Sequence, residues 1–184
     1  LCAGVLICVV TGLDSFAADA PPATYTTPEA AAADPDFGLQ GEYVGNGSGV
    51  QVVAQGKGAF LAVVYRGGLP GAGWNGIDKQ ETDEDSAAIQ ALIKDLALKK
   101  IERKSPTLGA KPPPGAVVLF DGQPESLQRH WQPGTKVDNG LLQQGSTSVD
   151  KFTDFVVHLE FRTPFMPAAR DQARGNSGIY YQGR

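Results

Sequence analysis

The segment Phe155–Arg162 alternates apolar and polar side chains with a period of two residues. Its apolar positions are Phe155, Val157, Leu159 and Phe161, and the intervening positions are Val156, His158, Glu160 and Arg162. Because successive side chains of a β-strand point to opposite faces, this pattern predicts a strand with one face in a core. The other face would carry an imidazole, a carboxylate and a guanidinium, a composition that suggests the floor of a polar binding site.

The first 20 residues have the composition of a secretory signal peptide without its basic start. An apolar run over residues 3–10 is too short to span a bilayer, and small residues that fit a cleavage site follow it. We therefore expect a secreted or periplasmic protein with no membrane partner after cleavage; a hydrophobic N-terminal strand is the alternative. Both cysteines, Cys2 and Cys8, fall in this segment, so the mature chain would have no disulfide.

Charge and composition exclude some classes of function. The chain has 16 basic and 20 acidic side chains, a net charge of -4 and no basic stripe, so we expect no nucleic-acid partner. Loss of Asp14 and Asp19 with the signal peptide would leave 16 minus 18, a charge of -2. The 23 glycines and 13 prolines favour turn-rich β structure over a helical bundle.

A small β-rich α+β module is predicted over residues 37–104, after a flexible leader over residues 21–36 that has almost no large apolar side chain. Short β-prone runs separated by glycine-containing turns predict an antiparallel meander. The runs cover residues 41–45, 50–54 and 59–65. A glycine-rich segment over residues 67–76 follows; Pro70 interrupts it and no Lys-Ser/Thr pair comes after it, so we expect a structural loop that seats Trp74 rather than a phosphate-binding loop.

One helix is predicted in this module, over residues 83–97. The side chains of Ile89, Leu92, Ile93 and Leu96 recur at helical spacing. The acidic residues 83–85 would lie in the first turn, where the helix dipole favours negative charge. Residues 98–104 fit either an extension of the helix or a strand.

Residues 105–115 contain four prolines and two glycines, which predicts a stiff linker and a domain boundary. A second unit is expected over residues 116–184, with a buried strand near its start. Asn139-Gly140 predicts a type I′ hairpin within residues 136–142. Further strands are expected at 155–163 and 177–182. A sheet that stopped there would keep an unpaired edge, so we expect the chain to be a C-terminally truncated fragment.

Several motifs of this second unit occur in a characteristic order. They are Leu119-Phe120-Asp121-Gly122, Trp131, Val137-Asp138-Asn139-Gly140-Leu141, Asp154-Phe155, His158-Leu159-Glu160-Phe161-Arg162 and Gly175-Asn176-Ser177-Gly178-Ile179-Tyr180. The set resembles the 3-keto-disaccharide hydrolase family, also described as 3-keto-glucoside 1,2-lyase/3-keto-2-hydroxy-glucal hydratase and formerly as a domain of unknown function. The 37–104 part is similar to the companion module that precedes this domain in secreted planctomycete-type proteins.

The resemblance implies a concanavalin-like jelly-roll β-sandwich that holds a saccharide on its concave face, of which residues 116–184 would be the N-terminal part. It also implies cleavage of 3-keto-glycosides, by hydrolysis or by elimination followed by hydration. Glu160 or His158 would act as the base and Arg162 would stabilise the enolate. The side chains expected to hydrogen-bond sugar hydroxyls are Asn176, Ser177, Tyr180 and Gln182.

Other interpretations of these residues remain open. His158 is also compatible with an ordinary exposed strand position, and Glu160 with a surface ion pair to Arg162. We predict no cofactor and assign no metal ligands, because His158 and Glu160 alone are too few ligands to argue a metal site; a divalent metal stays an open question. The alternative function is a non-catalytic carbohydrate-binding module on the same jelly roll; a scaffold or adhesion role is a lesser third.

Overall fold

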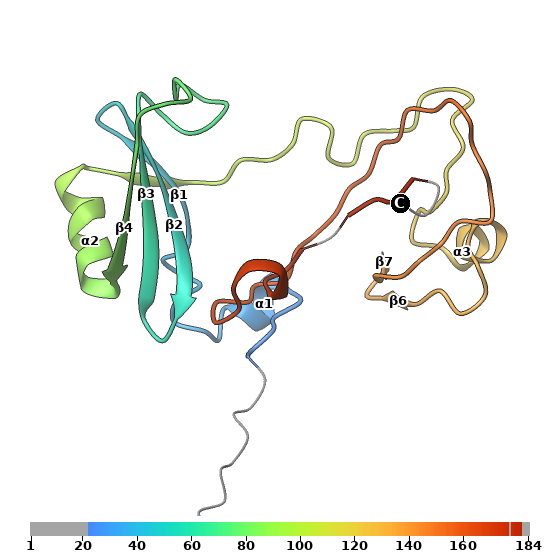
Figure 1. The fold of residues 1–184 in the computed structure, drawn as a ribbon, viewed down its shortest axis with the longest axis horizontal. Helices are drawn as coiled ribbons and strands as arrows, with labels where there is room; N and C mark the ends of the chain where they lie inside the picture. Colours follow the sequence, from blue (N-terminus) through green and yellow to red (C-terminus); the bar gives the residue numbers. More distant parts are fainter. Residues whose placement is uncertain (1–21, 177, 182–184) are drawn as a thin grey trace, which may run out of the picture.

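The computed structural model describes residues 22–176 and 178–181 of the 184-residue chain. The expected signal peptide and two of the expected sugar-binding residues, Ser177 and Gln182, lie outside these ranges. The described residues are mainly β, with few helices, and the largest element is a five-stranded antiparallel sheet (Figure 1). No helix in the described ranges is both long and apolar enough to cross a membrane.

The five-stranded sheet has the order β4-β3-β2-β1-β5. Its strands are β1 (Gly41–Gly45), β2 (Ser48–Gly56), β3 (Ala59–Arg66), β4 (Lys79–Asp85) and β5 (Lys99–Ile101). The predicted meander is confirmed by β1, β2 and β3. Both hairpin turns place two residues at positive φ, as type I′ turns require: Asn46 and Gly47 at 46° and 70°, and Lys57 and Gly58 at 58° and 78°.

The predicted helix is present but shorter, as α2 (Ser86–Asp95). Asp83 and Glu84 were expected in its first turn; instead they belong to β4 and pair with Leu61 and Phe60 of β3. The ladder to β3 overrides the weak β-propensity of acidic residues. Asp85 does cap the helix, since its Oδ1 accepts the N–H of Ala88 at 2.8 Å.

One face of the sheet packs against α2 and forms the main core. Its buried members are Ala31, Tyr43, Val50, Val52, Ala54, Phe60, Ala62, Ile89, Leu98 and Phe165. Burial of each of the largest of these side chains stabilises the fold by about 1.5–3 kcal/mol. Residues 98–104 were compatible with an extension of the helix or with a strand. Part of this range forms the strand β5, which pairs antiparallel with β1. Phe165 is separated from the sheet by more than 60 residues of sequence, yet it belongs to the same core.

The opposite face of the sheet is partly covered by the glycine-rich loop. Leu69 is fully buried in a second cluster with Val63 and Tyr65. Trp74 packs edge-on against Tyr65 at 5.0 Å between ring centroids, and its indole N–H donates to the Asp78 carbonyl at 3.0 Å. The loop therefore seats Trp74 as the sequence predicts.

The leader is folded over most of the length for which flexibility was expected. It contains α1 (Pro28–Ala31), and Ala31 is 1% exposed. Asp36 is 3% exposed, and both of its carboxylate oxygens accept the Gly58 N–H at 3.1 Å. The prediction of a flexible leader over residues 21–36 is thus wrong from Tyr25 onward, because Ala31 packs in the main core and the Asp36 carboxylate binds the main chain of Gly58.

Beyond residue 104 the described chain has little regular structure. It contains α3 (Pro124–His130), β6 (Val137–Asp138), β7 (Leu141–Leu142) and the short 3-10 helix η1 (Asp171–Ala173). The Asn-Gly hairpin is confirmed, with Asn139 and Gly140 at φ values of 49° and 73° between β6 and β7.

The strand predicted at residues 155–163 is not formed, nor is the one near residue 117. The segment is irregular and pairs with no neighbouring strand among the described residues. Its apolar row is exposed, from 43% at Val157 to 73% at Phe161. A period-two pattern provides an amphipathic strand, but a strand needs a ladder partner and an opposing sheet, and the described chain supplies neither. Residues 178–181 likewise form no strand.

Candidate functional site

His158 and Glu160 are the two predicted catalytic residues that the structure brings together. His158 Nε2 lies 3.3 Å from Glu160 Oε1, and the side chains are 55% and 40% exposed. The same Oε1 accepts the backbone N–H of Gly109 at 2.5 Å. Gly109 belongs to the proline-rich stretch expected to be a linker, so this stretch supports the candidate site directly.

The surroundings of Glu160 favour its ionised form. The backbone N–H of Gly109 is the main cause that lowers the pKa of the Glu160 carboxyl below its usual range, and the hydrogen bond to His158 adds to it. Both bonds fall on Oε1, and no hydrogen bond within the described chain reaches Oε2. Glu160 is thus a carboxylate at neutral pH, and its Oε2 has no hydrogen-bond partner among the described residues.

Among the described residues, the other predicted site residues, Arg162, Asn176 and Tyr180, make no hydrogen bond or ion pair with this pair. The pKa of the Glu29 carboxyl is lowered mainly by the Glu29 backbone N–H and next by the Thr27 side chain, and the charge of Arg162 adds the smallest contribution. Asn176 donates from Nδ2 to the carbonyl of Gln172 at 2.9 Å. Tyr180 is 76% exposed. Of the described members of the side-chain set that the resemblance implies, only His158 and Glu160 thus contact each other.

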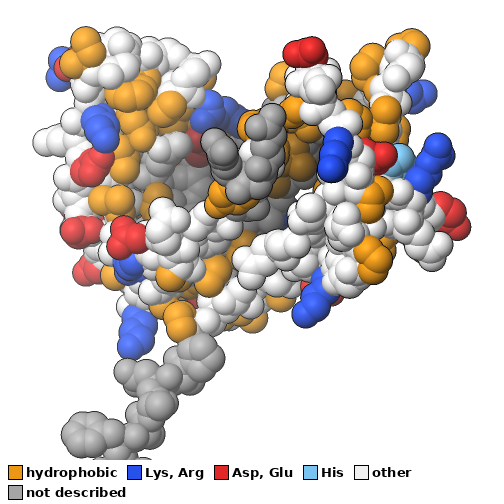
Figure 2. All heavy atoms as spheres, turned by 45° about the vertical axis from the view of Figure 1, so that its right-hand side comes forward, with side chains coloured by type: hydrophobic (Ala, Val, Ile, Leu, Met, Phe, Trp, Pro, Cys, Tyr) orange, Lys and Arg blue, Asp and Glu red, His pale blue; other side chains and the backbone are white. Residues whose placement is uncertain are grey.

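Aromatic contacts hold the two predicted site segments next to each other. Phe155 and Tyr181 lie 5.4 Å apart between ring centroids, and Phe152 packs edge-on against Phe155 at 6.2 Å. These rings are about half exposed or somewhat less. Hydrophobic side chains also lie at the surface among charged ones on the face drawn in Figure 2. The segment with His158 and the segment with Tyr180 thus meet without the predicted sheet.

A second histidine–carboxylate pair was missed by the sequence reasoning. His130, at the end of α3, places Nδ1 2.5 Å from Oδ2 of Asp150, and its side chain is only 12% exposed. Main-chain bonds fix the pair, because the Val149 N–H donates to the His130 carbonyl at 2.8 Å. With Nδ1 engaged, Nε2 is the nitrogen left for other partners. The partners lie 20 positions apart in the sequence, which hides the pair from any local motif search.

An open cavity of about 610 Å³ lies beside the β6–β7 hairpin. Its lining is mostly polar: Gln132, Pro133, Gly134, Thr135, Lys136, Gln143, Gln144, Gly145 and Thr147. Amide, hydroxyl and ammonium groups of this kind can hydrogen-bond a hydroxyl-rich ligand. The cavity follows directly on the His130 segment in sequence.

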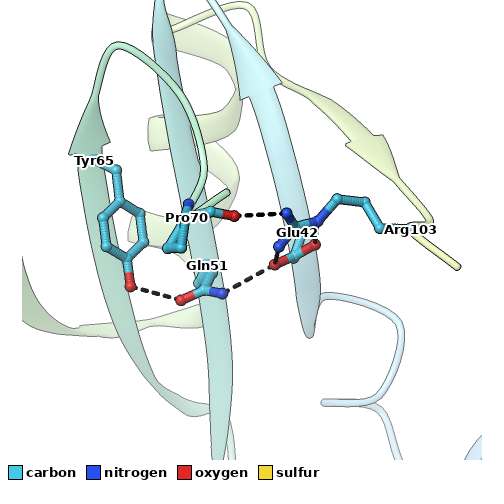
Figure 3. A network of polar contacts seen from close by, with 5 residues as sticks. All are labelled: Glu42, Gln51, Tyr65, Pro70 and Arg103. Atoms are coloured by element: carbon cyan, nitrogen blue, oxygen red, sulfur yellow. Dashed lines mark hydrogen bonds and ion pairs between the residues drawn. The ribbon is translucent and has the colours of Figure 1, made fainter. Parts of the chain in front are cut away.

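A polar network spans the sheet face opposite α2 (Figure 3). Tyr65 Oη donates to Gln51 Oε1 at 2.6 Å, and Gln51 Nε2 donates to Glu42 Oε1 at 2.9 Å. Arg103 donates to both oxygens of Glu42 at 2.5 Å and to the Pro70 carbonyl at 2.7 Å. Its polar atoms satisfy one another, so the network fastens the glycine-rich loop to the sheet.

No group of three potential metal-ligating side chains occurs within residues 22–176 and 178–181. Comparison of the chain with family models, curated proteins and solved structures finds no match. The site is therefore defined by its own geometry: a paired imidazole and carboxylate supported by a main-chain N–H.

Proposed function

We propose that this protein is an exported enzyme that cleaves 3-keto-glycosides, with Glu160 as its base. The observation that carries the proposal is the His158–Glu160 pair held by the Gly109 N–H, in a segment whose ordered motifs resemble 3-keto-disaccharide hydrolases. The concanavalin-like jelly roll is part of the proposal. The exposed apolar row of residues 155–161 supports it, since such a row is suited to burial between two sheets.

The chemistry follows from the ketone. A carbonyl at C3 acidifies the hydrogen at C2, and Glu160 Oε2 accepts that proton while the C–H electron pair forms the enolate. When the enolate re-forms the ketone, the C1 substituent leaves with its bonding electrons and takes up the proton that Glu160 accepted, which regenerates the carboxylate. Water then adds across the C1–C2 double bond, which gives net hydrolysis. His158 orients the carboxylate. Arg162 would stabilise the enolate oxygen once its side chain moves toward the bound substrate.

The test compares turnover of a 3-keto-glucoside by the intact protein and by Glu160→Gln. Loss of a general base lowers kcat by roughly 100-fold or more. Glu125→Gln is the matched control, because Glu125 is an exposed carboxylate of the same part of the chain with no side-chain partner among the described residues. We expect the control to keep the parental rate. Parental turnover by Glu160→Gln would show that the base is assigned wrongly.

A second candidate function is non-catalytic saccharide binding, which the polar cavity beside the β6–β7 hairpin favours. In that case neither the parent nor Glu160→Gln would turn over the substrate, and both would bind glycan equally. Lys136→Met would then weaken binding, because Lys136 is the cation of the lining. Calorimetric titration of the parent and the two variants with one oligosaccharide series separates the two functions.

A further inference from the structure

Residues 164–175, which we call the strap, form a closed loop between the two segments of the candidate site. Gly175 packs on Pro164 so closely that a Cβ added at Gly175 would lie 2.9 Å from Pro164 Cδ. The ends of the strap therefore meet. The segment with His158 and Glu160 enters at one end, and the segment with Asn176 and Tyr180 leaves at the other.

The strap docks onto the N-terminal module (residues 25–101) through a single antiparallel β-bridge. Tyr25 and Phe165 exchange both main-chain hydrogen bonds, at 3.0 and 2.9 Å. The Phe165 side chain is 8% exposed and lies 5.8 Å from the Tyr25 ring and 5.1 Å from the Phe37 ring. A ring buried in this way contributes as a core residue of the module, whose main cluster includes it.

Two arginines of the strap bind the module at a defect in its sheet. The β2–β3 ladder shifts register between Ala54 and Gly56, and a bulge of this kind leaves main-chain groups unpaired. Arg170 Nη2 donates to the Gln55 carbonyl at 2.6 Å, and Arg174 Nη1 donates to the Ala54 carbonyl at 2.9 Å. The strap thus supplies hydrogen-bond donors where the sheet leaves acceptors exposed.

Burial of Arg174 is consistent with a fitted contact. Desolvation is the main cause that lowers the pKa of its guanidinium below the usual value, and repulsion by Arg170 adds to it. Arg174 also reaches Gln40 with Nη2 at 3.3 Å. The same Gln40 Oε1 accepts the Ala54 N–H at 3.1 Å, so the arginine joins a bond that closes the edge of the sheet.

We propose that the module over residues 25–101 is a docking platform that positions the candidate site through the strap, with Phe165, Arg170 and Arg174 as positioning residues. Figure 1 shows the chain leaving the sheet region, crossing to the irregular part and returning to α1. Because the strap's ends meet, docking fixes the end of the segment with His158 and the start of the segment with Asn176 at one point. The effect on turnover rests on the proposed function, whereas the docking itself does not.

The docking is tested by cutting the chain in its exposed proline-rich stretch. A specific protease site placed between Lys111 and Pro112 would yield two fragments, of which the second carries the strap. We expect the nicked parent to elute as one complex in size-exclusion chromatography at micromolar concentration. Phe165→Ala should weaken the association about 100-fold, and Phe161→Ala, at a ring 73% exposed, should leave it unchanged. Separation of the parental fragments would overturn the proposal.

A second, milder variant distinguishes a positioning role of the strap from a general loss of stability. Arg174→Met keeps the apolar stem and removes the donors; Arg129→Met, at an exposed arginine of α3, is its control. We expect Arg174→Met to lower kcat for the 3-keto-glucoside with KM little changed, while hydrogen exchange in β1–β4 stays parental. Equal kcat in both variants, or lost protection throughout the sheet, would refute a positioning role. An inactive parent whose fragments still associate would refute only the proposed enzyme.

Discussion

Replacement of Gly49 by alanine tests how the glycine-rich loop is held on the sheet. A Cβ at this position would lie 2.6 Å from the Gly68 carbonyl carbon and 2.8 Å from Leu69 Cα, and it would also overlap the Leu69 nitrogen. The nearer of these carbons falls about 0.8 Å short of the ordinary contact distance of 3.4 Å. All three atoms are main chain, so no side chain can rotate away, and the loop must move off the sheet.

The expected loss of stability follows from what that movement disturbs. Overpacking of a fitted core costs about 1–3 kcal/mol. Lifting the loop also exposes part of Leu69, whose burial contributes about 1.5–3 kcal/mol. We therefore expect Gly49→Ala to lower the free energy of unfolding by about 3 kcal/mol, within the range of these two effects.

Urea denaturation followed by tryptophan fluorescence measures this change, because Trp74 sits on the displaced loop. A parental emission maximum would mean that the loop has not moved. Gly38→Ala is the control: its nearest neighbour is the Pro35 carbonyl oxygen at 4.0 Å. We expect the control within about 0.5 kcal/mol of the parent. If Gly49→Ala stays as close to the parent as the control does, the packing argument is wrong.

Two further predictions concern the module. Arg103 is the main cause that lowers the pKa of Glu42, so the stabilisation from this carboxylate is present above its ordinary pKa of about 4.5 and lost as the pH falls through the lowered folded value. Glu42→Gln should thus unfold at lower urea than the parent at pH 7, with a gap that closes in acid; a pH-independent gap would contradict this. Asp85→Ala should cost about 1 kcal/mol because the Ala88 N–H loses its cap, and Asp85→Asn should restore most of it; equal midpoints for both variants would exclude a capping role.

Local features of the fold were predictable because turn chemistry acts over a few residues. Asn139 and Gly140 adopt positive φ in a tight hairpin, as their sequence predicts. The glycine-bounded runs became β1, β2 and β3 for the same reason. In contrast, Asp83 and Glu84 were misplaced, since a register with β3 decides their structure and a one-dimensional pattern cannot show it.

The candidate site was predictable only within one segment. His158 and Glu160 are two residues apart and meet, whereas the Gly109 N–H that binds the same carboxylate is 51 residues away from Glu160. The His130–Asp150 pair joins residues separated by 20 positions and has no local signature. Such partners become visible only when the path of the chain is known.

The sequence by itself determined the type I′ turn at Asn139-Gly140, the existence of the meander and of α2, and the short separation of His158 and Glu160. These depend on φ preferences, hydrophobic spacing and short separations. Only the tertiary structure decided that Phe165 belongs to the core of the N-terminal module, 140 residues after its bridge partner Tyr25. The physical reason is that main-chain hydrogen bonds and burial stabilise any two complementary surfaces, whatever their separation in the sequence. The entropic cost of closing the loop between them grows only slowly with its length.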